Sequence, residues 1–169
     1  PHTSQRPELL RQRMDKVCLT CHNQPVIVEG GRVISNMASV LTKSKFLHGP
    51  VRAGSCSGCH DPHSSDEKML LKRPFTSSFY APFDVNNFAL CFKCHTDKMV
   101  LEPKTTDLTN FRNGSKNLHY MHVNRTQKGR TCRTCHVIHG SNLPKHMAAN
   151  VPFEGSDWPM PIRHDITPT

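Results

Sequence analysis

The chain has 169 residues and a formal net charge of +9, because 22 lysines and arginines stand against 13 aspartates and glutamates. Hydrophobic residues make up 36% of the sequence, below the roughly 45–50% of an average globular domain, a share that also counts glycine. We therefore expect one domain with too little apolar material for an ordinary core. No run approaches the roughly 18 consecutive apolar residues of a membrane-spanning helix, which excludes such a span. The start at Pro1, without an initiator methionine or a signal segment, predicts a mature, processed product.

The first part of the chain predicts a helix and a hairpin. Residues 7–21 show helical spacing, and Pro7 suits the first helical position. One face of this helix carries Leu10, Met14, Val17, Cys18 and Cys21, and the helix is expected to present the first haem. Two short runs, Val26–Val28 and Arg32–Ser35, flank the dipeptide Gly30-Gly31, which indicates a small hairpin.

Farther along the chain the predicted elements are shorter. Asp84 is the expected N-cap of a helix that ends at His95, and residues 116–124 predict another helix. The stretches 73–83 and 150–169 are rich in proline and are expected to be irregular. The predicted fold class is therefore mostly irregular with short α-helices and little β-structure, wrapped around a cofactor.

All eight cysteines fall into four copies of one pattern, Cys-x-x-Cys-His. No cysteine lies outside such a unit. We number the copies as motifs one to four in chain order: Cys18-Leu-Thr-Cys21-His22, Cys56-Ser-Gly-Cys59-His60, Cys91-Phe-Lys-Cys94-His95 and Cys132-Arg-Thr-Cys135-His136.

This pattern is the attachment site of c-type haem, in which two thiols bond to the porphyrin and the adjacent imidazole ligates the iron. One helical turn presents both sulfurs to one porphyrin edge and places the next residue under the ring. Zinc ribbons, redox dithiols and a disulfide framework also use paired cysteines. None of these requires a histidine directly after every pair, so the repeated histidine favours haem.

The segment from His48 to His63 resembles the doubled Cys-x-x-Cys-His module of bacterial and archaeal multihaem cytochromes. It reads His48-Gly-Pro-Val-x-x-Gly-Ser before motif two and Asp-Pro-His63 after it. Tetrahaem proteins of this kind include small periplasmic electron carriers and extracellular cytochromes that polymerise into conducting filaments, or nanowires. The resemblance covers the four motifs and their flanks, and it implies a haem-cored cytochrome with four covalently bound c-type haems.

The motifs are arranged as an internal duplication. Motifs one and three start 73 residues apart, and motifs two and four start 76 apart. Only motifs two and four have a further histidine three residues downstream and another upstream of the motif. The repeat unit therefore carries two haems and is used twice within one tetrahaem domain, residues 1–169. Its expected boundaries are about 7–75 and about 84–149, followed by a C-terminal arm, 150–169.

The motifs supply four proximal iron ligands, and the repeat selects four sixth ligands. The proximal ligands are His22, His60, His95 and His136. The histidines at repeated positions, expected as sixth ligands, are His48, His63, His122 and His139.

The reach of the backbone limits which iron each of these histidines can ligate. Three extended residues span at most about 10 Å, too little for His63 to pass around the porphyrin of its own motif. We therefore expect His63 to ligate the haem held by His22, and likewise His139 the haem held by His95. His48 precedes the proximal histidine of motif two by twelve residues and has the reach to ligate that motif's haem.

The remaining histidines and the methionines are weaker candidates for the sixth position. His119 corresponds to Lys45 in the other half, and His2, His146 and His164 lie outside the repeat. The seven methionines do not recur at equivalent positions. Bis-histidine ligation is therefore favoured, and it implies lower reduction potentials than ligation by methionine.

The positive charge is explained by the haems rather than by nucleic acid. Eight propionates lower a formal charge of +9 to about +1 with ferrous irons, and four ferric irons return it to about +5. The basic residues are spread along the chain without an aromatic-interleaved stripe. Acidic redox partners are still compatible with this charge, but nucleic-acid binding is not indicated.

Three functions are compatible with four haems. The leading hypothesis is electron transfer through six-coordinate haems, without catalysis. A multihaem reductase would need an iron with an open position. The third is a structural role as the repeating subunit of an extracellular conducting polymer. Such a subunit would associate head to tail, with the arm 150–169 locking the contact and a spare histidine able to cross the boundary. The expected location is extracytoplasmic: extracellular or cell-surface, with the periplasm as the alternative.

Overall fold

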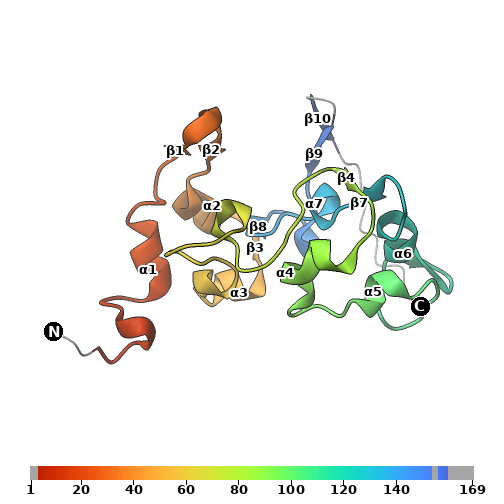
Figure 1. Cartoon of the computed structure of the whole chain (residues 1–169), viewed down its shortest axis with the longest axis horizontal. Helices are drawn as coiled ribbons and strands as arrows, with labels where there is room; N and C mark the ends of the chain where they lie inside the picture. The colour runs from red at the N-terminus through yellow and green to blue at the C-terminus, as the bar shows by residue number, and fades with distance from the viewer. Residues whose placement is uncertain (1–3, 154–155, 160–169) are drawn as a thin grey trace. The chain divides into compact units, whose positions relative to one another are not determined.

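The computed structural model describes residues 4–153 and 156–159, and these form two compact units (Figure 1). Residues 4–60 and 137–149 belong to the first unit. Residues 61–136, 150–153 and 156–159 belong to the second. Two of the places where the chain passes from one unit to the other fall directly after the histidine of a motif, at His60 and at His136, and each unit contains two of the four motifs.

The first unit is made of short helices joined by irregular chain. Its α-helices are α1 (Met14–Leu19), α2 (Met37–Lys43) and α3 (Gly49–Arg52). Its 3-10 turns are η1 (Pro7–Leu9), η2 (Glu29–Gly31), η3 (Cys56–Gly58) and η6 (Pro144–His146). Four two-residue strands form two antiparallel ladders: β1 (Val26–Ile27) with β2 (Val33–Ile34), and β3 (Phe46–Leu47) with β8 (Gly140–Ser141).

The second unit is also made of short helices joined by irregular chain. Its helices are α4 (Ala89–Phe92), α5 (Lys98–Leu101), α6 (Leu118–Val123) and α7 (Cys132–Cys135), with 3-10 turns η4 (Lys68–Leu70) and η5 (Val85–Phe88). Its antiparallel ladders are β4 (Tyr80–Ala81) with β7 (Gly129–Arg130), β5 (Arg112–Asn113) with β6 (Lys116–Asn117), and β9 (Asn150–Phe153) with β10 (Ser156–Pro159).

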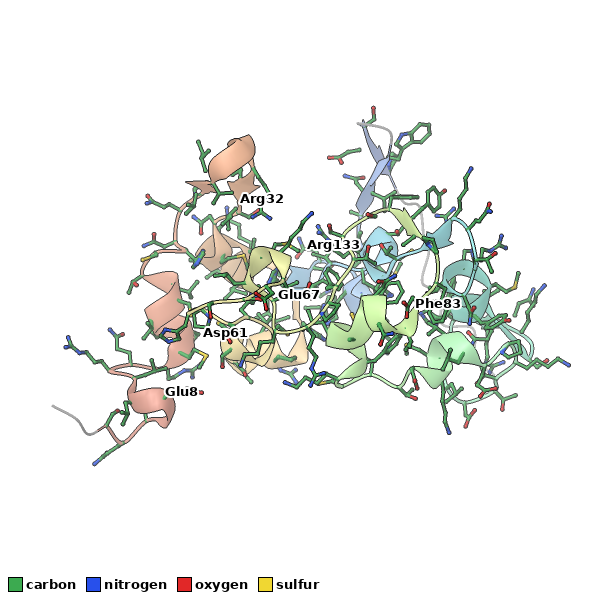
Figure 2. The ribbon with its side chains drawn as sticks, viewed as in Figure 1. Glu8, Arg32, Asp61, Glu67, Phe83 and Arg133 are labelled. Atoms are coloured by element: carbon green, nitrogen blue, oxygen red, sulfur yellow. The ribbon has the colours of Figure 1, made fainter. Side chains whose placement is uncertain are left out.

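The apolar core among the described residues is small. One cluster in the second unit consists of Phe88, Val100 and Val123, and Phe83, labelled in Figure 2, packs against it. The other buried hydrophobic residues are Leu71, Met147 and Ala148. This is little apolar burial for a chain of this length, as the composition predicted. Within residues 4–153 and 156–159, no helix is long and apolar enough to cross a membrane.

The predicted fold class is confirmed, since short helices, few short strands and long irregular connections make up both units. The hairpin predicted between Val26 and Ser35 is present as β1 and β2. Asp84 caps η5 by accepting from the amide of Asn86 at 2.9 Å, but the helix predicted to end at His95 is divided into η5 and α4 and ends at Phe92. The helix predicted over 116–124 is present as α6.

Two other predictions about regular structure are wrong. The helix predicted over 7–21 is interrupted, because Glu8 and Leu9 have left-handed backbone angles (φ of 53° and 55°) and only α1 is α-helical. The arm 150–169 is not wholly irregular, since β9 and β10 form a hairpin, visible in Figure 1. Positions 154–155 and 160–169 of that arm lie outside the described residues.

Candidate haem-binding site

All four motifs fold into one helical turn with the same hydrogen bond. The backbone N–H of each motif histidine donates to the carbonyl of the first cysteine four residues earlier, at 2.9–3.1 Å. The four bonds are His22 to Cys18, His60 to Cys56, His95 to Cys91 and His136 to Cys132. The common turn places two thiols and one imidazole in the same local order four times, as the spacing predicted.

Within each unit, the first cysteines of the two motifs lie next to each other and interact. In the first unit Cys56 interacts with Cys18, and burial together with this neighbour raises the pKa of Cys56 to about 11. In the second unit Cys132 interacts with Cys91. A hydrogen bond donated by Cys132 lowers the pKa of Cys91 and raises the pKa of Cys132. Each unit therefore brings two haem-attachment points together.

Contacts with α1 hold motif two in the first unit. The N–H of Ser57 donates to the Met14 sulfur at 3.2 Å. The salt bridge between Arg13 and Asp15 (3.0 Å) lies against Gly54, which has a φ of +74°. A Cβ at Gly54 would lie 3.0–3.2 Å from these two side chains, which would have to shift slightly, and the left-handed backbone angle favours glycine.

Two buried threonines hold motif four in the second unit. Thr131 donates from its hydroxyl to the carbonyl of Ser78 at 2.6 Å, and Thr134 donates to the carbonyl of Phe79 at 2.9 Å. Both threonines are almost fully buried. These bonds attach α7, which carries Cys132 and Cys135, to the segment before β4.

A recurrent loop follows motifs two and four. In both copies a serine lies five residues after the motif histidine. Its Oγ donates to the carbonyl of the residue six positions later and accepts the backbone N–H of the residue two positions later. Two consecutive residues in each copy have left-handed backbone angles, and they are Met69-Leu70 and Lys145-His146. The downstream histidine lies just before the serine in both loops, so the loops place His63 and His139 at equivalent positions.

A third copy of the loop lies at the start of the described chain, where no motif precedes it in this sequence. Ser4 donates to the carbonyl of Leu10 at 2.7 Å and accepts the amide of Arg6 at 3.1 Å. Glu8 and Leu9 have the left-handed angles. The sequence Pro1-His2-Thr-Ser4 matches Pro62-His63-Ser-Ser65, so His2 has the repeat position that sequence analysis assigned only to His63 and His139. His2 itself lies outside the described residues.

Asn117 organises the second unit around α6. Its side chain is fully buried and accepts the amides of His119 and Tyr120, which caps the helix. Its Nδ2 donates to the carbonyls of Met99 and Glu102, at 2.9 and 2.8 Å. Sequence analysis missed this residue, because an asparagine before a helix signals a cap but gives no sign of its contacts with α5.

The histidines predicted as sixth ligands differ in their surroundings. His63 and His122 are exposed, whereas His48 and His139 are half-buried. The Nδ1 of His122 donates to the carbonyl of Leu118 at 2.7 Å, which leaves Nε2 as the nitrogen able to bind a metal. The ring of His48 lies edge-on to that of His146, at 5.6 Å between centroids.

His119, a weaker candidate on sequence, is half-buried in the second unit. Burial, with His136 and His122 nearby, lowers the pKa of His119 to about 4. Its ring is therefore neutral near pH 7. The ring of His119 also packs edge-on against Phe111, at 5.1 Å between centroids.

The residues present fit covalently bound haem. Four pairs of cysteines each stand beside an imidazole on one helical turn. The Nδ1 atoms of His22 and His146 are buried without a hydrogen-bond partner. Among the described residues, no group of three or more His, Cys, Asp or Glu side chains is arranged to hold a metal ion. A haem iron requires only two protein ligands, because the porphyrin supplies the other four.

Comparison with known proteins identifies the same motif. A family model described as the doubled CXXCH motif matches residues 1–26 and 48–100. These segments include motifs one to three, and motif four lies beyond them. No curated protein and no solved structure matches the chain. The match supports a multihaem c-type cytochrome, in which the motifs indicate covalently bound haem c, and this implies electron transfer.

Proposed function

We propose that this protein transfers electrons through four c-type haems, each held by one motif, and that it is not an enzyme. The observation that carries the proposal is the repetition of one local structure, since all four motifs have the same turn and hydrogen bond. The haem supplies the one-electron chemistry of its iron. The chain supplies thiols that fix the porphyrin edge and an imidazole that ligates one face.

The pairing of motifs supports transfer between haems. Cys18 lies against Cys56, and Cys91 lies against Cys132. A porphyrin bonded to each of these thiols would have its edge near that of its neighbour. Two haems attached at adjacent points in each unit are suited to passing an electron from one haem to the other.

Intact mass after denaturation tests the haem count. We expect the mass to exceed that of the polypeptide by four haems, with no thiol left to react with an alkylating reagent, because all eight cysteines are consumed. A Cys132→Ser/Cys135→Ser variant is the matched control and should carry three haems. A mass equal to the bare polypeptide, or two haems in the unaltered protein, would contradict the proposal.

We further propose that the protein works outside the cytoplasm as the repeating subunit of an extracellular conduit. The support is the resemblance to filament-forming cytochromes and the exposure of the hairpin of β9 and β10. Trp158 on this hairpin is 56% exposed, and all four residues of β10 are exposed. A large exposed apolar residue on a projecting hairpin suits contact with a second copy. The alternative is a periplasmic carrier that works as a monomer.

Replacing Trp158 with serine tests this assembly more cleanly than deleting the arm, because β9 contacts α7 and its removal would disturb motif four. We expect Trp158→Ser to keep the full haem content and to weaken self-association by about tenfold or more, since the apolar side chain is lost from the contact. Sedimentation velocity over a range of concentrations measures this. A protein that is strictly monomeric at high concentration would favour the periplasmic carrier.

A further inference from the structure

Two pairs of imidazole rings in this protein have nearly parallel planes and nearly the same separation. His60 and His139, in the first unit, have ring centroids 6.2 Å apart and an interplanar angle of 11°. His119 and His136, in the second unit, have centroids 6.5 Å apart and an angle of 17°. Each pair joins the proximal histidine of a motif, His60 or His136, to a histidine outside any motif.

This separation is the one that two imidazoles have when they ligate the same iron from opposite sides. Two metal–nitrogen bonds of about 2 Å, with the distance from each nitrogen to its ring centre, add up to roughly 6 Å. Ordinary aromatic pairs also lie about 4.5–7 Å apart, so the separation points to ligation because each pair contains a proximal histidine and has nearly parallel planes. The third histidine pair, His48 and His146, is nearly perpendicular, at 77°, and contains no proximal ligand.

In the first unit, backbone contacts bring His139 beside the proximal histidine of motif two. Strand β8 begins directly after His139 and pairs with β3, and the N–H of His48 donates to the carbonyl of His139 at 3.2 Å. The pairing needs a glycine after His139. A Cβ at Gly140 would lie only 2.7 Å from the side chain of Ser44. The long-range ladder therefore fixes the position of His139 in this unit.

Two hydrogen bonds hold His119 in the second unit. The Asn117 side chain accepts the N–H of His119 at 3.0 Å. The Nδ1 of His119 hydrogen-bonds to the hydroxyl of Thr109 at 3.0 Å. Because one ring nitrogen is occupied in this way, Nε2 is the nitrogen available to a metal. His122 lies on the same helix but is exposed.

The two halves differ at one position that bears on iron ligation. The position that holds His119 in the second half holds Lys45 in the first. A protonated lysine cannot ligate iron, so the first half has no equivalent of His119. The ladder of β3 and β8 instead brings His139, from the loop after motif four, beside His60.

We propose that His139 is the sixth ligand of the haem held by His60, and that His119 is the sixth ligand of the haem held by His136. This rests on haem attachment at motifs two and four. It assigns His139 to a different iron from the one expected on sequence, and it adds His119 to the ligand set.

Single substitutions in the haem-loaded protein test which residues ligate. His139→Gly and His119→Gly should each convert one haem of four from low-spin to high-spin, detected by electronic absorption and electron paramagnetic resonance. Added imidazole should return that haem to low-spin. Arg32→Ala, at an exposed position outside every motif (Figure 2), is the control and should leave all haems low-spin.

Removing one haem at a time tests which iron each histidine ligates. In a Cys56→Ser/Cys59→Ser protein, which lacks the haem of motif two, His139→Gly should produce no new high-spin haem. In a Cys132→Ser/Cys135→Ser protein, which lacks the haem of motif four, His119→Gly should likewise produce no new high-spin haem. If His139 ligates the haem of His95 instead, one of the three remaining haems becomes high-spin, which overturns that assignment.

The intact protein offers a second measurement that does not depend on these variants folding. Nuclear Overhauser contacts should connect the imidazole of His139 to the haem bonded to Cys56, and the imidazole of His119 to the haem bonded to Cys132. Contacts from His122 to the Cys132 haem would overturn the second assignment. A protein with its haems attached but with different axial ligands refutes this inference alone, whereas a protein without attached haem refutes the proposed function.

Discussion

Replacing all eight cysteines with serine is expected to abolish cooperative folding of this chain. The described residues contain only six buried hydrophobic side chains, and three of them form one small cluster. Strands of two to four residues and helices of at most seven add little stability of their own. Covalently attached haem is the large apolar body around which the motif turns and their flanking segments can pack.

Circular dichroism during heating measures this effect. The haem-loaded protein should show a sigmoidal transition, and the cysteine-free chain should show a broad, non-cooperative change from the lowest temperature. Ser55→Ala/Ser57→Ala, which alters residues beside two of the cysteines and keeps all thiols, is the control for the substitutions themselves. A cysteine-free chain that melts cooperatively would mean that the apolar contacts suffice without haem.

The motifs and their local structure were predictable from the sequence because a five-residue turn depends on local spacing. The turn at Cys18–His22 and its three counterparts needed no knowledge of the rest of the chain. The cap at Asp84 and the hairpin of β1 and β2 were predictable for the same reason. Motif spacing is also what the matching family model detects.

The features that the sequence did not reveal depend on contacts between distant segments. The register of β3 with β8 joins residues more than 90 positions apart, and it brings His139 close to His60. An estimate of how far the extended backbone can span from the nearest motif could not predict this ladder. The interruption of the helix predicted over 7–21 could have been found from the sequence. Ser4, the serine of its loop, corresponds to Ser65 and Ser141, and the residues that follow each serine have similar spacing.

Replacing Asn117 with alanine is expected to lower the free energy of unfolding by about 2–5 kcal/mol. The loss of the cap on α6 accounts for about 1 kcal/mol. The carbonyls of Met99 and Glu102 would each lose the hydrogen bond that the fully buried Asn117 side chain donates. Losing each of these partly buried hydrogen bonds costs about 0.5–2 kcal/mol.

Denaturant unfolding of the haem-loaded protein measures this loss, with Asn117→Ser as the matched variant. Serine can still cap α6 but cannot reach both carbonyls, so it should recover about 1 kcal/mol relative to alanine. Because His119 is the second residue of α6, the alanine variant should also increase the high-spin fraction of one haem as the helix start frays. An Asn117→Ala protein with an unchanged unfolding midpoint and no high-spin haem would show that α6 is held by other contacts, and that His119 does not depend on its cap.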